Sequence, residues 1–223
     1  AAALLVPADP RLLALAFVWH VRRSPHPLVP ARAVATRPAW GSLAVSFFVG
    51  AALIAALVDI PVFARLTEYP DSQLMAALVL VRLLAALPVG AVSGGYLTRT
   101  LPAGVVSAAG MLMSAAGFAW MSTWGDASLG SPLATVPLVL TGFGFGLALA
   151  PVNAALLAST PHDVHGVASA LVVVARRCGM LIGISALTTI GMRRFYQAVR
   201  EMSVHDAGLA QVHVVFLGAA ICA

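Results

Sequence analysis

Residues 161–194, which read PHDVHGVASALVVVARRCGMLIGISALTTIGMRR, narrow the possible folds of this chain more than any other segment. The segment is mostly apolar or small, and it exceeds the roughly 20 apolar residues that a helix needs to cross a bilayer. Arg176 and Arg177 nevertheless lie at its middle. An ionised side chain at that depth costs roughly 2.5 kcal/mol or more, and such residues usually face a protein interior or a water-filled path. The rest of the fold therefore has to accept this charge.

The composition of the whole chain is that of a membrane protein. Hydrophobic residues make up 61% of the 223 residues and charged residues only 9%, whereas a soluble domain carries about 25% charged residues. The net charge is +5, and the arginines are scattered rather than gathered in a basic patch of the kind that binds nucleic acids. No HExxH, GxSxG or P-loop pattern occurs. We therefore expect neither ATP-driven transport nor a common hydrolase chemistry, and no cofactor.

The spacing of the apolar runs predicts an all-α membrane protein. Shorter apolar runs at residues 11–21 and 209–223 indicate a partial span at each end of the chain. The loop 24–38 carries arginines and no acid, which places it on the cytoplasmic side by the positive-inside rule. Five runs are long enough to cross a bilayer, over residues 41–64, 73–96, 103–123, 135–158 and 161 to about 192.

The last complete span has a predicted start and a predicted continuation. Thr160 is placed as its N-cap, Pro161 at its first position and Asp163 near the positive end of the helix dipole. Residues 193–207 are polar and partly amphipathic, so we predict an outside segment there. The last span would then begin at residue 209.

The turn after the second complete span reads GGYLTRT over residues 94–100. It resembles the loop signature of the major facilitator superfamily, in which a glycine-rich helix end is followed by G-x-L-x-D-R. Gly95, Leu97 and Arg99 match, while Thr98 stands at the acidic position, which argues against a strong charge-relay role. Two interpretations of Arg99 are open. It bonds to the C-terminal carbonyls of a neighbouring helix, or it is a snorkelling arginine on a helix end made of small residues.

A longer match follows in the second half of the chain. It comprises GFGFG at 142–146, Pro151, HGVAS at 165–169 and RRCGMLIG at 176–183, in this order. These motifs resemble the C-terminal half of the fourteen-helix drug:proton antiporters of the superfamily. The segments VVVAR and GMLIG are particularly similar to the corresponding segments of the mycobacterial exporters of lipids and drugs.

The resemblance implies a set of domains and partners. Residues 1–23 would be the end of an extra central transmembrane segment, 24–40 a cytoplasmic linker, and 41–223 an incomplete C-terminal six-helix bundle with its last helix truncated. The partners would be the bilayer, an N-terminal helix bundle of the same protein, protons and a small hydrophobic substrate. Similarity to the mycobacterial exporters also implies a periplasmic lipoprotein. The protein would be a multi-pass protein of the bacterial plasma (inner) membrane.

Three charged residues inside the spans are candidates for ion pairing. Asp59 and Arg82 lie on consecutive antiparallel spans, about 9 Å and 15 Å from the turn between them, so the arginine can reach the acid. This pair is either proton-sensitive, with a carboxylate that protonates during transport, or a structural buried ion pair. For Arg176 the resemblance implies a carboxylate in the other bundle, so that the two form a gate. The alternative is that Arg176 bonds locally to carbonyls or to Asn153.

Prolines and glycines supply the remaining candidates. Pro151 and Asn153 lie on the fourth complete span, which corresponds to the first span with Asp59 if the bundle is an inverted repeat. Kinked helices at matched positions often line the path, so Pro151 and Asn153 are cavity-lining candidates. Small residues spaced four positions apart along a helix indicate close helix packing. The alternative is a hinge or a sealed interface between bundles. These residues are Gly142, Gly144, Gly146, Gly179 and Gly183.

His162, Asp163 and His165 lack a convincing third ligand nearby, so we predict no metal site. The sequence favours part of a proton-driven exporter of drugs or amphiphilic, lipid-like compounds that works by alternating access. A facilitator of another small solute is the alternative within transport, and a polytopic membrane scaffold is the alternative outside it. An enzyme would need catalytic residues clustered at one membrane face, which the sequence lacks, whereas a scaffold would not need charges at depth.

Overall fold

The computed structural model describes residues 19, 36–125, 128–200 and 203–223. Each of the six long helices in this part is long and apolar enough to cross a membrane, which confirms the predicted all-α membrane fold. The predicted segments 1–23 and 24–40 lie almost entirely outside the described residues. The helices are α2 (Arg37–Leu66), α3 (Gln73–Leu97), α4 (Ala103–Met121), α5 (Thr135–Ala158), α6 (His165–Ala198) and α7 (Val204–Cys222), with short 3₁₀ turns η2 (Pro132–Ala134) and η3 (His162–Val164).

Hydroxyl side chains fix the starts of three helices. The hydroxyl oxygens of Thr36 and Ser72 each accept a hydrogen bond of 3.3 Å from the backbone N–H three residues later, at the starts of α2 and α3. Ser203 does the same for α7 with the N–H of Asp206, at 3.1 Å. Each bond satisfies one of the N–H groups that a helix start leaves without a partner.

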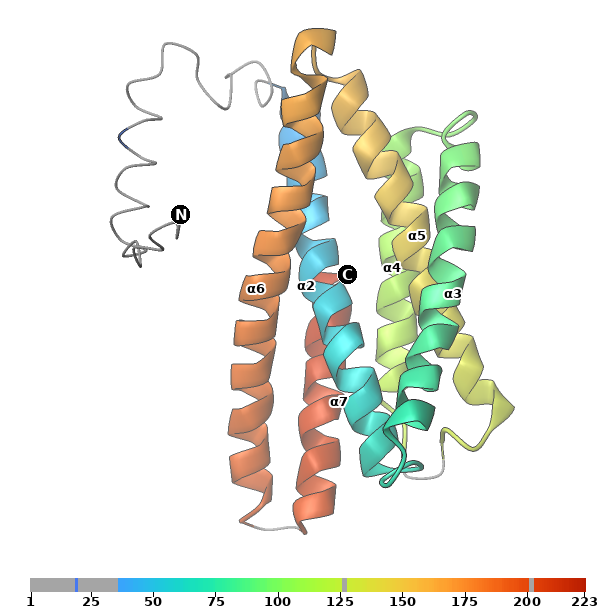
Figure 1. Cartoon of the computed structure of the whole chain (residues 1–223), viewed down its shortest axis with the longest axis vertical. Helices are drawn as coiled ribbons and strands as arrows, with labels where there is room; N and C mark the ends of the chain where they lie inside the picture. The colour runs from blue at the N-terminus through green and yellow to red at the C-terminus, as the bar shows by residue number, and fades with distance from the viewer. Residues whose placement is uncertain (1–18, 20–35, 126–127, 201–202) are drawn as a thin grey trace, which may run out of the picture.

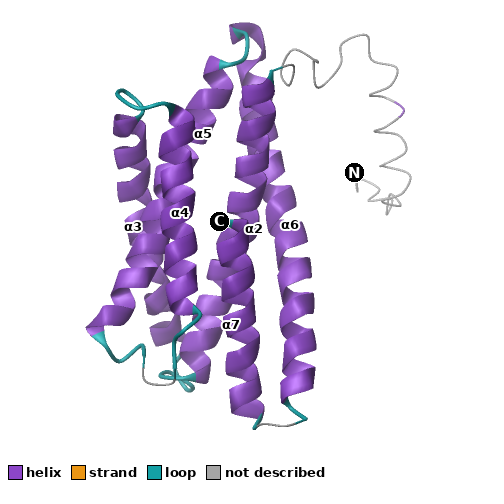
Figure 2. Cartoon of the chain, turned by 180° about the vertical axis from the view of Figure 1, so that it is seen from behind, coloured by secondary structure: helices purple, strands orange, loops and turns teal. Residues whose placement is uncertain are grey.

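The bundle consists of two groups of three helices. In one group α2 packs against α6 and α7, and in the other α5 packs between α3 and α4 (Figure 1). Seen from behind, α4 and α7 face the viewer and lie next to each other where the groups meet (Figure 2). Phe63, Phe118, Phe145 and Phe216 join the two groups through ring contacts, with centroids 5.9–6.4 Å apart. All four rings are fully buried.

Glycines allow the tightest crossings within each group. A side chain at Gly179 of α6 would overlap the backbone carbonyl of Phe47, and one at Gly50 of α2 would overlap that of Arg176. The backbones of α2 and α6 are therefore in direct contact. Gly142 and Gly146 face the carbonyls of Leu83 and Leu87 in the same way, which brings α5 against α3. Gly144 lies against Gly110 of α4, and a Cβ there would be 2.5 Å from the Gly110 oxygen. These are the contacts that membrane helices make through small residues.

Three predicted boundaries are wrong. Thr160 is not an N-cap, because its hydroxyl donates to the carbonyls of Leu156 and Leu157 at 3.1 Å and 3.3 Å and so helps to close α5. α6 begins at His165 and continues to Ala198, into the first part of the predicted outside segment 193–207, since helix formers follow its apolar part. α7 begins at Val204 instead of residue 209, and by length and composition it can cross a membrane.

Candidate functional site

Arg176 is held where α6 crosses α2. Its Nη2 donates to the hydroxyl of Ser46 on α2 at 3.5 Å, and that hydroxyl donates in turn to the carbonyl of Val172 at 3.2 Å. Ser46 is fully buried and Arg176 is half-buried. The Nε–H of Arg176 is buried without a hydrogen-bond partner among the described residues. The guanidinium therefore has a local contact at the long end of the hydrogen-bond range and an unused donor beside it.

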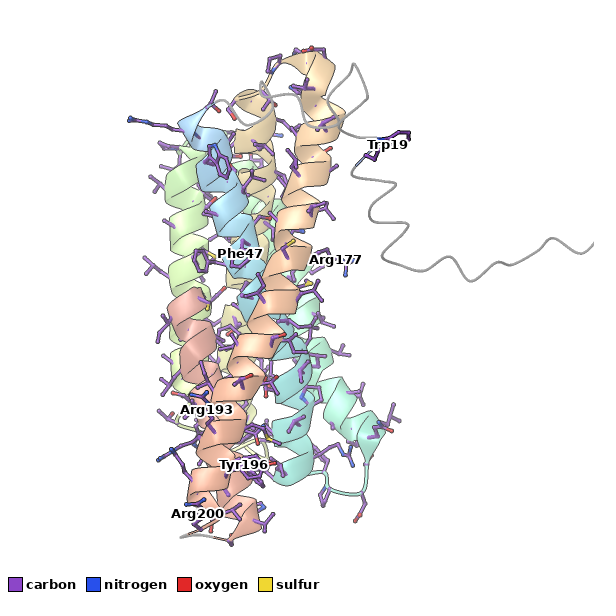
Figure 3. All side chains as sticks on the ribbon, turned by 90° about the vertical axis from the view of Figure 1, so that its left-hand side faces the viewer. Trp19, Phe47, Arg177, Arg193, Tyr196 and Arg200 are labelled. Carbon is purple, nitrogen blue, oxygen red and sulfur yellow. The ribbon has the colours of Figure 1, made fainter. Side chains whose placement is uncertain are left out.

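The neighbouring arginine points elsewhere. Consecutive residues of a helix lie about 100° apart around its axis, and Arg177 is exposed. Figure 3 shows Arg177 on the opposite side of α6 from Phe47, which lies at the α2 crossing. The two charges of the pair thus face different surroundings: Arg176 lies toward α2 and Arg177 lies on an open face of the bundle.

Asp59 has no hydrogen bond or ion pair with any residue that the structure describes. It lies half-buried on α2, two residues before Pro61, and α2 remains helical through that proline. A carboxylate that lacks a cation at this depth is an unusual and costly arrangement, and such residues in membrane proteins mark pathways for ions or substrates.

The predicted ion pair between Asp59 and Arg82 does not form. Arg82 instead donates from Nη1 to the hydroxyl of Thr135 at the start of α5, at 3.1 Å. The reason is the packing of α3, which crosses α5 closely at Gly142 rather than lying along α2. Although α2 and α3 are consecutive in the chain, they are not each other's closest neighbours, so the turn between them does not predict which side chains pair.

Pro151 and Asn153 lie on the inner face and the outer face of α5, respectively. Pro151 is buried and Asn153 is exposed, and α5 continues through the proline to Ala158. Asn153 makes no hydrogen bond with Arg176, so the local partner of that arginine is Ser46. Ser46 is the residue that sequence reasoning missed. No signal in the sequence singles it out, because Ser42 is a second serine of the same apolar run.

The loop motif ends α3 without the predicted carbonyl bond. The guanidinium of Arg99 lies over the ring of Tyr96, 4.9 Å from its centroid, and is otherwise exposed. The hydroxyl of Thr98, at the acidic position of the signature, donates to the carbonyl of Gly95 at 2.8 Å. Gly94 makes the close helix contact, with a Cβ position 2.7 Å from the Leu147 oxygen, whereas Gly95 faces open space and Leu97 is exposed.

The histidines before α6 do not gather metal ligands. The rings of His162 and His165 lie 4.5 Å apart, and Nε2 of His165 lies 3.0 Å from the carbonyl oxygen of Thr160. Within the described ranges no group of three or more His, Cys, Asp or Glu residues could hold a metal ion.

The chain is similar in sequence to a known family and to several curated proteins. A family model described as Major Facilitator Superfamily matches residues 2–184. The chain is 37% identical over 201 residues to a triacylglyceride transporter of Mycolicibacterium smegmatis, an alignment that covers 86% of this chain and 36% of the relative. A triacylglyceride transporter of Mycobacteroides abscessus is 38% identical over 192 residues, covering 82% and 37%.

The triacylglyceride transporter of Mycobacterium tuberculosis H37Rv is 39% identical over 200 residues, which cover 85% of this chain and 38% of that protein. The chain thus spans little more than a third of the length of these curated relatives.

Proposed function

This chain belongs to the Major Facilitator Superfamily, and on that basis we propose that it forms one helix bundle of a proton-driven exporter of lipid-like amphiphiles. With six membrane-length helices it is a multi-pass membrane protein, consistent with a bacterial inner membrane. The relatives named triacylglyceride transporters support a lipid-like substrate. Drugs of similar amphiphilic character belong to the same proposal. Transport would proceed by alternating access between this bundle and a second one.

Asp59 is the observation that carries the proton-driven part of the proposal. An ionised carboxylate inside a bilayer is costly unless a cation pairs with it, and no described residue pairs with Asp59. Proton uptake removes that cost. Asp59 would therefore take up a proton in one state of the transport cycle and lose it when the path opens to the other side, so that proton flow is coupled to substrate movement.

Arg176 would serve as the gate. Its Nε–H has no partner among the described residues and its contact with Ser46 is long, so the guanidinium would gain from a better acceptor. A carboxylate accepts two parallel hydrogen bonds from an arginine, which is stronger than one bond to a hydroxyl. A carboxylate of the second bundle would close the path by binding Arg176, and the bond would break when the bundles separate.

The test is to replace Asp59 in the full-length protein reconstituted in liposomes. A fluorescent triacylglycerol analogue would be followed while a proton gradient is imposed across the membrane. We expect Asp59→Asn to abolish the dependence of transport on the gradient. Asp71→Asn is the matched control, because Asp71 is exposed in the turn between α2 and α3 and should leave the coupling unchanged.

Two results of this test speak against the proposal. If Asp59→Asn retains the coupling of the wild type, the carboxylate has no part in it. If the wild-type protein moves the lipid equally well without a gradient, the protein is a facilitator.

A further inference from the structure

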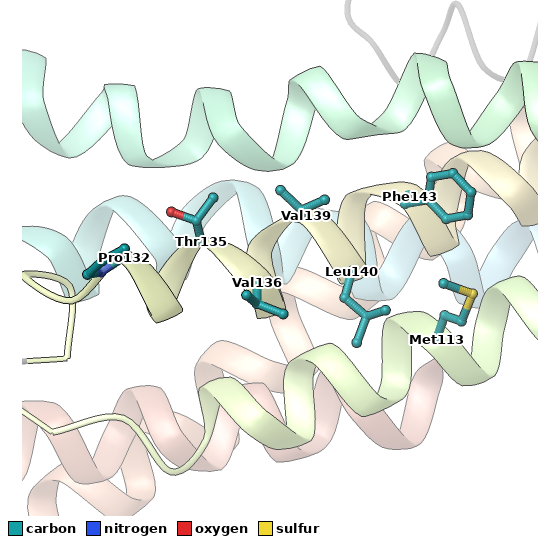
Figure 4. Close-up of a pocket in the computed structure, with 7 residues that line it drawn as sticks. All are labelled: Met113, Pro132, Thr135, Val136, Val139, Leu140 and Phe143. Atoms are coloured by element: carbon teal, nitrogen blue, oxygen red, sulfur yellow. The ribbon is translucent and has the colours of Figure 1, made fainter.

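An apolar groove runs along α5 where that helix is exposed between α3 and α4. Figure 4 shows Val136 and Leu140 turned toward α4, and the hydroxyl of Thr135 turned toward α3. Val136 and Val139 are 45% and 40% exposed. The lining residues are Pro132, Thr135, Val136, Val139, Leu140 and Phe143, with Met113 of α4. From Pro132 to Phe143 the groove is about 16 Å long, at 1.5 Å per helical residue.

The guanidinium of Arg82 reaches the end of this groove where α5 begins. Its neighbour Leu83 is level with Gly142 in the crossing of α3 and α5. Thr135 lies about 10 Å nearer the start of α5 than Gly142, at 1.5 Å per residue. Since Nη1 of Arg82 reaches the Thr135 hydroxyl, the side chain extends along the bundle toward the helix start. A long basic side chain that extends toward a helix start in this way can place its charge nearer a polar layer while its stem stays on apolar surface.

The guanidinium retains most of its hydrogen-bonding capacity. Arginine has five N–H donors and no acceptor, and the hydrogen bond of Arg82 goes to Thr135. No acidic residue in the described part of the chain pairs with it. The groove lining contains no charged side chain, and Thr135 is its single hydroxyl. A cationic guanidinium with free donors thus lies at one end of the apolar groove.

We propose that this groove binds an anionic lipid of the surrounding membrane leaflet. Its phosphate would bind the guanidinium of Arg82 and its acyl chain would lie along α5 over Val136 and Val139. The planar guanidinium matches a phosphate through two parallel hydrogen bonds. A lipid stands in a leaflet with its headgroup at the surface and its chains directed inward. This is the order of groups from Arg82 toward Phe143 along the groove.

Both parts of the site are needed for this choice of ligand. A free anion would use Arg82 and leave the apolar groove without a function, while a neutral lipid would use the groove and leave the guanidinium unpaired. The inference does not rest on transport, because binding at this surface needs no proton gradient.

The experiment measures lipid retention by the purified full-length protein in neutral detergent, with native mass spectrometry as the readout. The probes are phosphatidylglycerol and phosphatidylcholine with identical chains. We expect the wild type to prefer phosphatidylglycerol. Arg82→Gln should lower its affinity for that lipid about 10-fold or more, as the loss of a charged hydrogen bond implies. The affinity for phosphatidylcholine should stay the same, and Arg82→Lys should give an intermediate value because it keeps the charge without the fork.

The acyl-chain part is tested by filling the groove. Val139→Trp should weaken phosphatidylglycerol binding while Arg82 is intact. The matched controls are Arg200→Gln, an exposed arginine just beyond α6, and Val173→Trp, a 52% exposed valine of α6. Both should retain the lipid as the wild type does.

The inference is overturned if Arg82→Gln keeps the wild-type preference or loses both lipids equally. It also fails if inorganic phosphate displaces the lipid and Val139→Trp has no effect, since Arg82 would then be a site for a free anion. Failure of gradient-driven transport with normal lipid retention would instead count against the proposed function alone.

Discussion

The crossing of α2 and α6 should be sensitive to a single methyl group at Gly183. A Cβ at this position would lie 2.6 Å from Cα and 2.8 Å from Cβ of Ala51 on α2. Carbon atoms meet favourably at about 3.5–4.0 Å, so α6 has to move away from α2 by about 1 Å. Overpacking of this kind costs about 1–3 kcal/mol. Relative to a Gly→Ala change where the Cβ meets open space, Gly183→Ala should therefore lower the free energy of unfolding by that amount.

The assay is thermal unfolding of the full-length protein in detergent, followed by circular dichroism. At about 2–4 °C per kcal/mol for a domain of this size, the melting temperature should fall by about 2–12 °C. Gly166→Ala is the matched control, because Gly166 lies on the same helix and has no atom within 4 Å of its Cβ position. It should keep or raise the melting temperature, since alanine favours a helix over glycine by about 0.5–1 kcal/mol. Equal melting of Gly183→Ala and Gly166→Ala would refute the close crossing.

Three other substitutions test single contacts by the same melting assay. Ser46→Ala should cost about 1–3 kcal/mol because it leaves a donor of the nearby arginine unsatisfied, whereas Ser42→Ala, at a buried serine of the same helix, should cost less. Ser203→Ala should cost about 0.5–2 kcal/mol through loss of the α7 cap; an unchanged melting temperature would show that the cap is unimportant. His213→Phe removes the 2.7 Å bond between Nε2 and the carbonyl of Trp124 and should cost about 0.5–1.5 kcal/mol. No loss of stability would mean that water replaces this bond.

The sequence was sufficient for features that depend on local composition. The ends of α5 agree with the prediction because both coincide with the ends of an apolar run. The start of α3 agrees at Gln73, directly after the serine that caps it. Length and apolarity set where a helix can lie in a bilayer, and both can be read without knowing which helices are neighbours.

Features that depend on helix neighbours could not be read in this way. The partner of Arg82 cannot be read from the sequence because the crossing of α3 with α5 decides what its side chain reaches. Ser46 was missed because its role depends on α6 lying against α2, over a hundred residues away in the chain. A threonine hydroxyl can cap the start of a helix or donate to carbonyls at the end of the preceding one. The sequence around Thr160 allows both, and the fold selects the second. Charges in the predicted spans single out candidate residues, while their partners depend on the three-dimensional arrangement.

Proton-coupled movement of lipid is the central claim for the protein. The most direct measurement uses the wild-type full-length protein in liposomes loaded with a fluorescent triacylglycerol analogue, with and without an imposed proton gradient. The account predicts net movement of the lipid that follows the direction of the gradient, reverses with it and stops when a protonophore collapses it. Movement of the same rate and extent in the absence of a gradient would contradict it.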